Sequence, residues 1–140
     1  MLVRLLYASR AVAGLSTDEL GVILKRSRAF NPEHGVTGVL CYADGVFMQV
    51  LEGGRDVVNG LYKQIVMDPR HSDVVIVKYQ EISERQFAGW AMGQVTLSRL
   101  NPGLVLKYCK SSKLDPYEMT GHALMALFNE LVSSGAIVSS

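Results

Sequence analysis

The segment GVTGVLCYADGVFMQVLEGG, residues 35–54, contains two apolar runs separated by an Asp-Gly pair. An Asp-Gly pair between two apolar runs is a strong signal for a β-hairpin, because the favoured two-residue turn needs residues that tolerate positive φ angles. We therefore predict a strand over Gly35–Tyr42, a turn at Ala43–Gly45 and a second strand over Val46–Leu51.

A helix is predicted on the N-terminal side of this hairpin. Ser16, followed by Glu19 three residues later, is a capping box, so the helix should begin near Thr17. A residue that precedes proline avoids helical backbone angles, and we therefore expect Asn31-Pro32 to end the helix.

A second helix is predicted on the C-terminal side of the hairpin, from about Asp56 to Met67, and Asp68-Pro69 should end it in the same way. Three further apolar runs have the length and composition that are typical of strands. These runs are Leu2–Ala8, Val74–Ile82 and Trp90–Leu97.

The predicted elements follow in the order strand, helix, strand, strand, helix, strand, strand. This order resembles the split βαβ, ferredoxin-like pattern with one added strand. We therefore expect an α+β fold in which a five-stranded mixed sheet carries two helices on one face.

Residues 99–140 are predicted to form a C-terminal helical extension. Pro102–Cys109 reads as a short helix, and Pro116–Val132 as a longer helix with one apolar stripe. The extension is expected either to cover the other face of the sheet or to contact a partner, and the tail Ser133–Ser140 is expected to fray. The stripe consists of Leu124, Leu127, Phe128 and Leu131.

The composition excludes several classes of protein. The chain has 140 residues, of which 49% are hydrophobic, and a formal net charge of +1, which argues against a disordered chain and against binding to nucleic acid or an anionic membrane. No apolar stretch is long enough to span a membrane, and two cysteines form no disulfide framework, so the cytoplasm is the expected compartment. The mean hydropathy of +0.18 is high for a small monomer and indicates a self-interface or a partner surface.

The motifs of several enzyme classes are missing from the sequence. It contains no GxGxxG fingerprint, no Walker loop, no HExxH and no paired Cys-x-x-Cys. No serine or cysteine lies in a recognisable nucleophile elbow, and the three histidines fall in different predicted elements. A hydrolase is therefore poorly supported.

Two polar side chains occur at apolar strand positions. Tyr7 ends the first apolar run, and Gln49 shares a strand face with Phe47 and Leu51. A buried glutamine amide must find hydrogen-bond partners, because each unpaired group costs about 1–3 kcal/mol. Either this face is buried and supplies those partners, or it is exposed to solvent or at a sheet edge.

Each predicted helix carries a stripe that is apolar in the middle and polar at its C-terminal end. Two such helices could sandwich a flat apolar ring and hydrogen-bond its polar edge. Alternatively, both helices pack on the sheet and their polar ends face solvent. The stripes are Ile23, Ser27 and Asn31 on the first helix, and Leu61, Ile65 and Asp68 on the second.

Four further residues are candidates for binding or chemistry. Trp90 and Met92 are expected to share one face of the last strand, where ordinary core residues also lie. Arg70 and His71 follow the second helix, where they either reach a phosphate or ribose or lie in a solvated turn. None of these signals is specific alone, but their joint occurrence is.

The combined set resembles the BLUF family of flavin-based blue-light sensors. The resemblance covers residues 1 to about 98 closely and extends more loosely through the C-terminal helices, as in the short, single-domain members of the family. It rests on Tyr7, Ser27, Asn31, Gln49 and Trp90-x-Met92, and on the contiguous stretches Leu6–Ser9, Gly35–Leu40, Phe47–Gly53 and Phe87–Met92.

The resemblance implies a domain over residues 1–98 that binds FAD noncovalently and is not an enzyme. It implies that Ile23 and Ile65 flank the isoalloxazine ring and that Asn31 hydrogen-bonds its C4=O and N3 edge. It further implies that four polar residues line the ring's polar periphery and the ribityl-phosphate end, namely Ser27, Asp68, Arg70 and His71.

The chain departs from the family's pattern at two positions. Gln64 stands where the family often has an arginine that contacts phosphate, and Phe30 stands where a polar residue is common. Either Lys63 or Arg70 supplies the missing charge, or the adenine end is bound loosely. Because the sequence has no glycine fingerprint, discrimination among FAD, FMN and riboflavin is expected to be weak.

The resemblance also implies a mechanism. Light-excited flavin oxidises Tyr7, and after the electron and proton return, the amide of Gln49 has rotated or tautomerised, donates to the flavin C4=O and shifts the absorption to the red. Gln49 is expected to couple to Met92 or Trp90, and through the last strand to the C-terminal helices. Because no effector domain follows, we expect the light signal to pass to a separate downstream signalling protein. We also expect the chain to form a homo-oligomer.

Other functions stay open at this point. A small flavin-binding oxidoreductase would need room for a substrate over the ring. An acylphosphatase-like hydrolase would need a glycine-rich phosphate loop, of which Ala11–Gly14 is a poor version. A nucleic-acid-binding module would need exposed aromatic and basic residues on the sheet.

Overall fold

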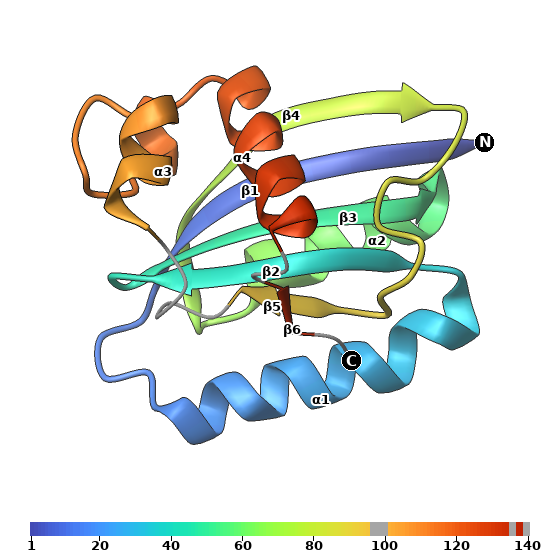
Figure 1. Cartoon of the computed structure of the whole chain (residues 1–140). Helices are drawn as coiled ribbons and strands as arrows, with labels where there is room; N and C mark the ends of the chain where they lie inside the picture. Colours follow the sequence, from blue (N-terminus) through green and yellow to red (C-terminus); the bar gives the residue numbers. More distant parts are fainter. Residues whose placement is uncertain (96–100, 135–136, 139–140) are drawn as a thin grey trace.

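A computed structural model describes residues 1–95, 101–134 and 137–138 (Figure 1). A sheet forms the middle layer, and helices lie on both of its faces. The elements are β1 (Leu2–Ala11), α1 (Thr17–His34), β2 (Thr37–Ala43), β3 (Val46–Gly54), α2 (Arg55–Met67), β4 (His71–Ile82), β5 (Gly93–Val95), α3 (Pro102–Tyr108), a 3-10 turn (Pro116–Glu118), α4 (Gly121–Ser133) and β6 (Ile137–Val138).

The strands are arranged in the order β4-β1-β3-β2-β5-β6. The pairs β4–β1, β1–β3 and β3–β2 are antiparallel, whereas β2 and β5 are parallel, so the sheet is mixed. The split βαβ prediction with one added strand is confirmed, and each of the five expected segments contains a strand, although the last strand is shorter than expected. The short strand β6 adds to β5, so the expectation that the whole tail frays is wrong; backbone pairing with Gln94 and Val95 orders it.

The hairpin predicted from the Asp-Gly pair is also present. Asp44 and Gly45 both have positive φ angles, of 52° and 75°, as the two-residue turn requires. The pairing continues outward from this turn, and β3 also pairs with β1 on its other side. In that second pairing, Tyr7 lies opposite Gln49 and Arg4 lies opposite Glu52.

The first helix begins as predicted but ends later. The capping box between Ser16 and Glu19 is formed, but α1 continues past Pro32 to His34. Asn31 keeps helical geometry because its buried amide donates to the carbonyl of Ala91, a tertiary bond that the rule for residues before proline does not include. The helix ends where Gly35 adopts a left-handed conformation, with φ at 68°. The second helix ends before Asp68, as predicted.

The segment before β5 is a loop, which corrects the predicted strand over Trp90–Leu97. Residues 83–92 form bends and turns, and β5 covers only Gly93–Val95. Because strand alternation does not apply in a loop, Trp90 and Met92 do not share a face: Trp90 packs with the cluster under α4, and Met92 with the cluster under α1 and α2. Residues 96 and 97 of the prediction lie outside the described part of the chain.

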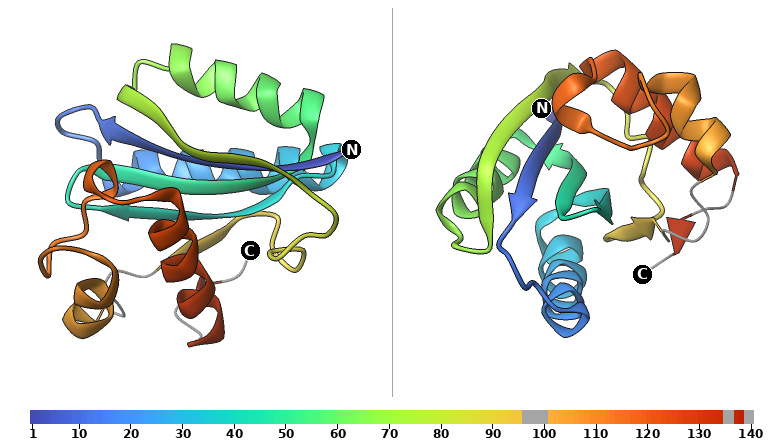
Figure 2. Two further views of the ribbon diagram at one scale, coloured as in Figure 1. Left: turned by 90° about the horizontal axis from the view of Figure 1, so that it is seen from above. Right: turned by 90° about the vertical axis from the view of Figure 1, so that its left-hand side faces the viewer.

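Helices cover both faces of the sheet (Figure 2), and each face has its own apolar core. One core lies under α1 and α2 and includes Tyr7 and Phe47; the other lies under α3 and α4. The stripe on α4 is buried in the second core, so of the two alternatives the structure supports the one in which the extension covers the other face of the sheet. Its members, Leu124, Leu127, Phe128 and Leu131, are at most 1% exposed.

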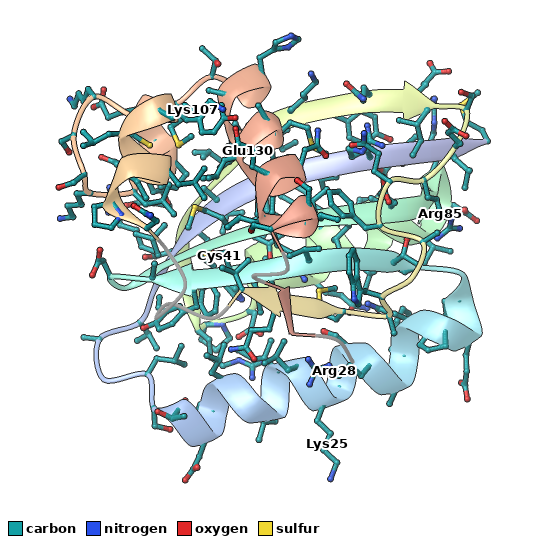
Figure 3. All side chains as sticks on the ribbon, viewed as in Figure 1. Lys25, Arg28, Cys41, Arg85, Lys107 and Glu130 are labelled. Carbon is teal, nitrogen blue, oxygen red and sulfur yellow. The ribbon has the colours of Figure 1, made fainter. Side chains whose placement is uncertain are left out.

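Polar contacts tie the C-terminal elements to each other and to the sheet. On α4, the Glu130 carboxylate accepts hydrogen bonds from Lys107 and Tyr108 of α3 (Figure 3). The Tyr117 hydroxyl donates to the backbone carbonyl of Asp73 in β4, and the Arg10 guanidinium lies 4.3 Å from the centre of the Tyr117 ring.

Among the helices that the structure describes, none is both long and apolar enough to cross a membrane.

A buried ion pair joins three segments on the α4 side of the sheet. Arg4 donates to the carboxylate of Glu52 at 2.7–2.8 Å, and Glu52 is fully buried. The same carboxylate accepts backbone N–H bonds from Gln86 and Phe87. Glu52 therefore holds β1, β3 and the loop before β5 together. Arg85 in this loop adds hydrogen bonds to backbone carbonyls at the β3 end and before β2 (Figure 3).

We expect Glu52→Gln to lower the free energy of unfolding by about 3–5 kcal/mol, because it leaves the charge of Arg4 buried without a counter-ion while an oxygen remains to accept the loop N–H bonds. Urea unfolding followed by circular dichroism measures the change. The matched control is Glu81→Gln, which removes an exposed pair with Arg55 and should cost less than about 0.5 kcal/mol. Equal effects of the two substitutions would contradict this role of Glu52.

Candidate functional site

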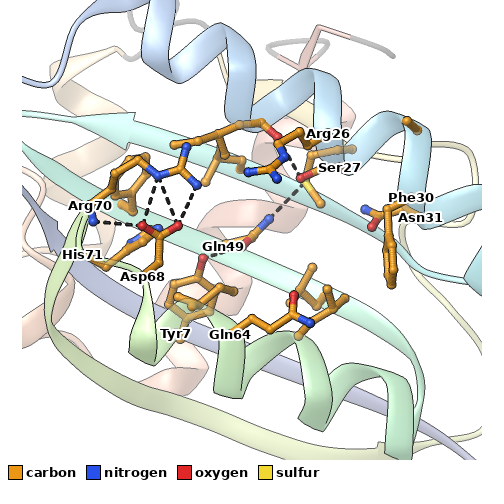
Figure 4. Close-up of a pocket in the computed structure, with 18 of the residues that line it drawn as sticks. Tyr7, Arg26, Ser27, Phe30, Asn31, Gln49, Gln64, Asp68, Arg70 and His71 are labelled. Atoms are coloured by element: carbon orange, nitrogen blue, oxygen red, sulfur yellow. Dashed lines mark hydrogen bonds and ion pairs between the residues drawn. The ribbon is translucent and has the colours of Figure 1, made fainter.

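A cavity of about 600 Å³ lies between α1, α2 and the face of the sheet that these helices cover (Figure 4). Its size is in the range of cavities that hold small molecules and cofactors. Apolar residues from three sources line it, namely Ile23 of α1, Leu61 and Ile65 of α2, and Leu40, Phe47 and Leu51 of the sheet. Its polar lining residues include Tyr7, Ser27, Asn31, Gln49, Asp68, Arg70 and His71.

A chain of hydrogen bonds crosses the floor of this cavity. The Tyr7 hydroxyl on β1 donates to Oε1 of Gln49 on β3, and Nε2 of Gln49 donates to the Met92 sulfur at 3.3 Å. All three side chains are buried, and burial raises the pKa of Tyr7 well above its usual value. Tyr7 is therefore a neutral phenol. The strand face that carries Gln49 is therefore buried, which was one of the two alternatives. Tyr7 and Met92 are the hydrogen-bond partners of its amide.

Met92 and Trp90 have different positions relative to the cavity. Met92 lines it, and the backbone carbonyl of Met92 accepts a hydrogen bond from Arg28 of α1 at 3.1 Å. Trp90 is not among the lining residues and instead lies near Phe87 in the opposite core. The expected choice between the two residues as partner of Gln49 therefore falls on Met92.

The α1 wall contains the three residues of the predicted stripe. Ile23, Ser27 and Asn31 all line the cavity. The Ser27 hydroxyl donates to the backbone carbonyl of Ile23 and keeps its lone pairs as acceptors. Asn31 uses one amide N–H on the carbonyl of Ala91 at 2.7 Å, which leaves its second amide hydrogen and its oxygen available to a bound ligand.

The end of the cavity next to β4 contains Asp68, Arg70 and His71 (Figure 4). The Arg70 guanidinium donates to both Asp68 oxygens, and these hydrogen bonds hold the pKa of Asp68 below its usual value. His71 forms a hydrogen bond of 2.7 Å with the buried hydroxyl of Ser9, and partial burial lowers the pKa of His71. The pair Asp68–Arg70 is therefore charged but internally neutralised, and His71 is neutral near pH 7.

Sequence reasoning missed several functional residues. Arg26, which also lines the cavity, lies on an exposed part of α1 where no apolar pattern points to it. Arg28 contacts Met92 across 64 positions of sequence, which no local pattern can predict. Leu40 could have been found, because the hairpin pairs it with Gln49 and so places both side chains on one face of the sheet. Phe30 and Gln64, noted as departures, both line the cavity.

The arrangement suits a flat heterocycle with a polar edge and a polar tail. Apolar side chains from α1 and α2 face each other across the cavity, while amides of Asn31 and Gln49 offer donors and acceptors. Asp68, Arg70 and His71 are polar groups at one end. These residues fit a flavin, which has an apolar ring face, a pyrimidine edge that both donates and accepts, and a hydroxylated side chain.

Comparison with known proteins gives the same result. A family model described as sensors of blue-light using FAD matches residues 2–93. The chain is 38% identical over 96 residues to the photoactivated adenylate cyclase subunit beta of Euglena longa, and this match covers 68% of the chain and only 11% of that protein.

Solved structures similar to the chain include BlsA in its photo-activated state, with a TM-score of 0.86, 33% sequence identity and coverage of 94% of this chain and 95% of that one. They also include BlrB, a BLUF protein in its dark state, with a TM-score of 0.81, 28% identity and coverage of 96% of each chain. The region matched by the family model contains every residue that lines the cavity. The chain belongs to the BLUF family of blue-light sensors that use a flavin.

Proposed function

We propose that this chain senses blue light through FAD bound in the cavity, and that Tyr7 and Gln49 form a hydrogen-bond switch that light reverses. The observation that carries this proposal is the buried chain from the Tyr7 hydroxyl through the Gln49 amide to the Met92 sulfur. It lies on the floor of a cavity walled by two helices, where a bound ring would contact it.

Tyr7 is the electron and proton donor of this switch. A flavin that has absorbed blue light is a strong oxidant, which can take an electron and a proton from a nearby phenol. Burial keeps the Tyr7 phenol protonated in the dark, so both particles are available. The Tyr7 hydrogen already points at Gln49, which links its loss and return to the orientation of that amide.

Gln49 can keep a changed hydrogen-bonding pattern after the electron and proton have returned to Tyr7. The reason is that the two ends of its amide have nearly the same shape but opposite hydrogen-bonding roles. In the arrangement described, Oε1 accepts from Tyr7 and Nε2 donates to Met92. Rotation or tautomerisation exchanges these roles. We place the C4=O edge of the ring beside Gln49 and Asn31, so that the reversed amide donates to it and shifts the flavin absorption to the red.

Met92 carries the change away from the cavity. The segment Ala91–Met92 is held by Gln49 at the sulfur, by Asn31 at one carbonyl and by Arg28 at the next. Reversal of the Gln49 amide removes the first of these bonds and leaves the other two. The segment leads directly into β5, which pairs with β6 at the end of the C-terminal extension. A shift of β5 therefore reaches residues 99–140.

We assign the remaining cofactor contacts as the family resemblance implies, and all the residues concerned line the cavity. Ile23 and Ile65 would flank the ring, and Asn31 would bind its C4=O and N3 edge. The residues on the ring's polar periphery and ribityl side would be Ser27, Asp68, Arg70 and His71. FAD is the cofactor favoured by the family match, with FMN and riboflavin as possible substitutes.

The output is a change in protein–protein contact rather than a reaction catalysed by this chain. Residues 1–98 form the flavin-binding domain, and residues 99–140 transmit the state of Gln49 to a separate signalling protein in the cytoplasm or to a second copy of the chain. Such a signal requires that the dark and lit forms bind the partner with different affinity. The similarity to a photoactivated adenylate cyclase subunit supports a signalling role, because in that protein light activates an adenylate cyclase.

We expect Gln49→Leu to retain flavin but to lose the light-induced red shift, because leucine fills the same space and has no donor to offer the ring. Absorption spectra before and after blue light measure the shift. The control is Gln64→Leu, the same substitution at the rim of the same cavity, which should keep the shift. A normal photocycle in Gln49→Leu would overturn the proposed switch.

We expect Tyr7→Phe to abolish the long-lived red shift, because phenylalanine has neither the hydroxyl proton nor the low oxidation potential of a phenol. Tyr62→Phe is the matched control, since the Tyr62 ring packs edge-on against Tyr7 with ring centres 6.0 Å apart. This control should keep the shift. A persistent shift in Tyr7→Phe would assign the donor role to another residue.

A further inference from the structure

Besides Tyr7, five charged or titratable side chains line the cavity, and they are unevenly distributed. Asp68, Arg70 and His71 lie at one end, whereas Glu33 lies near the C-terminal end of α1. The fifth is Arg26, two helical turns before Glu33 and therefore about 10 Å from it along the α1 axis. In Figure 4, Arg26 lies beside Ser27, on the side of the cavity toward Arg70 and away from Phe30.

The two basic residues at the end of the cavity next to β4 already have protein partners. Arg70 forms a two-oxygen ion pair with Asp68, so its charge is neutralised within the cavity wall. The His71 ring forms a hydrogen bond with the Ser9 hydroxyl, and the ring is neutral near pH 7. On α2, Gln64 contributes no charge, and Lys63 is not among the residues that line the cavity.

Arg26 differs from these residues. Its side chain is exposed, and among the described residues it forms no hydrogen bond or ion pair. A guanidinium at the rim of a cavity, with its donors directed at no protein group, matches the geometry and charge of a phosphate. Among the described residues that line the cavity, no carboxylate competes for it, since Asp68 is paired with Arg70 and Glu33 is two turns away.

We propose that Arg26 binds the phosphate attached to the flavin's ribityl chain and makes the cavity prefer phosphorylated flavins over riboflavin. This inference rests on the proposed function, because it needs a flavin in the cavity. The phosphate contact would then come from Arg26 on α1 and not from α2, where Gln64 has no charge to offer. This assignment also replaces the sequence-based expectation that Lys63 or Arg70 supplies that charge.

The test compares FMN and riboflavin, which differ only by the phosphate, as ligands of the flavin-free full chain. Dissociation constants are measured from the quenching of flavin fluorescence at low and at high salt. We expect Arg26→Gln to weaken FMN binding by about fivefold and riboflavin binding by less than about twofold. In the wild type, added salt should weaken FMN binding more than riboflavin binding, because salt screens an exposed charge pair.

Lys25→Gln is the matched control, because it removes the same charge one position earlier on α1, where the side chain points away from the molecule (Figure 3). It should leave both constants unchanged, and Arg26→Lys should keep most of the FMN preference. Unchanged FMN binding in Arg26→Gln would overturn the inference, as would equal weakening of both ligands. If the wild type bound neither flavin, the proposed function would fail and the inference with it.

Discussion

The antiparallel register between β1 and β3 is the constraint on which the rest of the structure depends, because it places Tyr7 directly opposite Gln49. Shifting the pairing by one residue would turn every side chain of one strand to the other face. The pair Arg4–Glu52, three positions further along the same two strands, opposes such a shift, since it would separate two buried charges. An ion pair in one core thus holds the hydrogen bond in the other core in place.

The loop before β5 is held from both faces of the sheet by the same strand. On the α4 side, Glu52 of β3 accepts the N–H groups of Gln86 and Phe87. On the cavity side, Gln49 of β3 reaches Met92. In the proposed switch, the bonds to Glu52 involve no group that changes on illumination, whereas the bond to Met92 does. The loop would then have one fixed end and one end whose contact depends on the state of Gln49, and β5 would follow the second.

Local patterns predicted those elements whose signals lie close together in sequence. The Asp44-Gly45 turn, the Ser16 capping box and the polar ends of the two helical stripes all act within a few residues, and they led to the sheet and to most of the cavity lining. The failures involve distant partners. Asn31 stays helical before Pro32 because of Ala91, and Glu52 is buried because Arg4 and the 86–87 backbone compensate it. Trp90 does not lie in the predicted strand, because the segment around it forms turns and bends. The periodicity of the sequence does not distinguish such a loop from a strand.

The most direct test of this account is the visible absorption spectrum of the purified full chain, recorded in the dark, after blue light and during recovery. The account predicts flavin bands that move to longer wavelength by a small amount without loss of intensity and return in the dark, because only the hydrogen bonding of the ring changes. Bleaching of the bands would show net reduction and point to a flavin oxidoreductase. A chain that takes up no flavin, or whose bands do not move, would contradict the account.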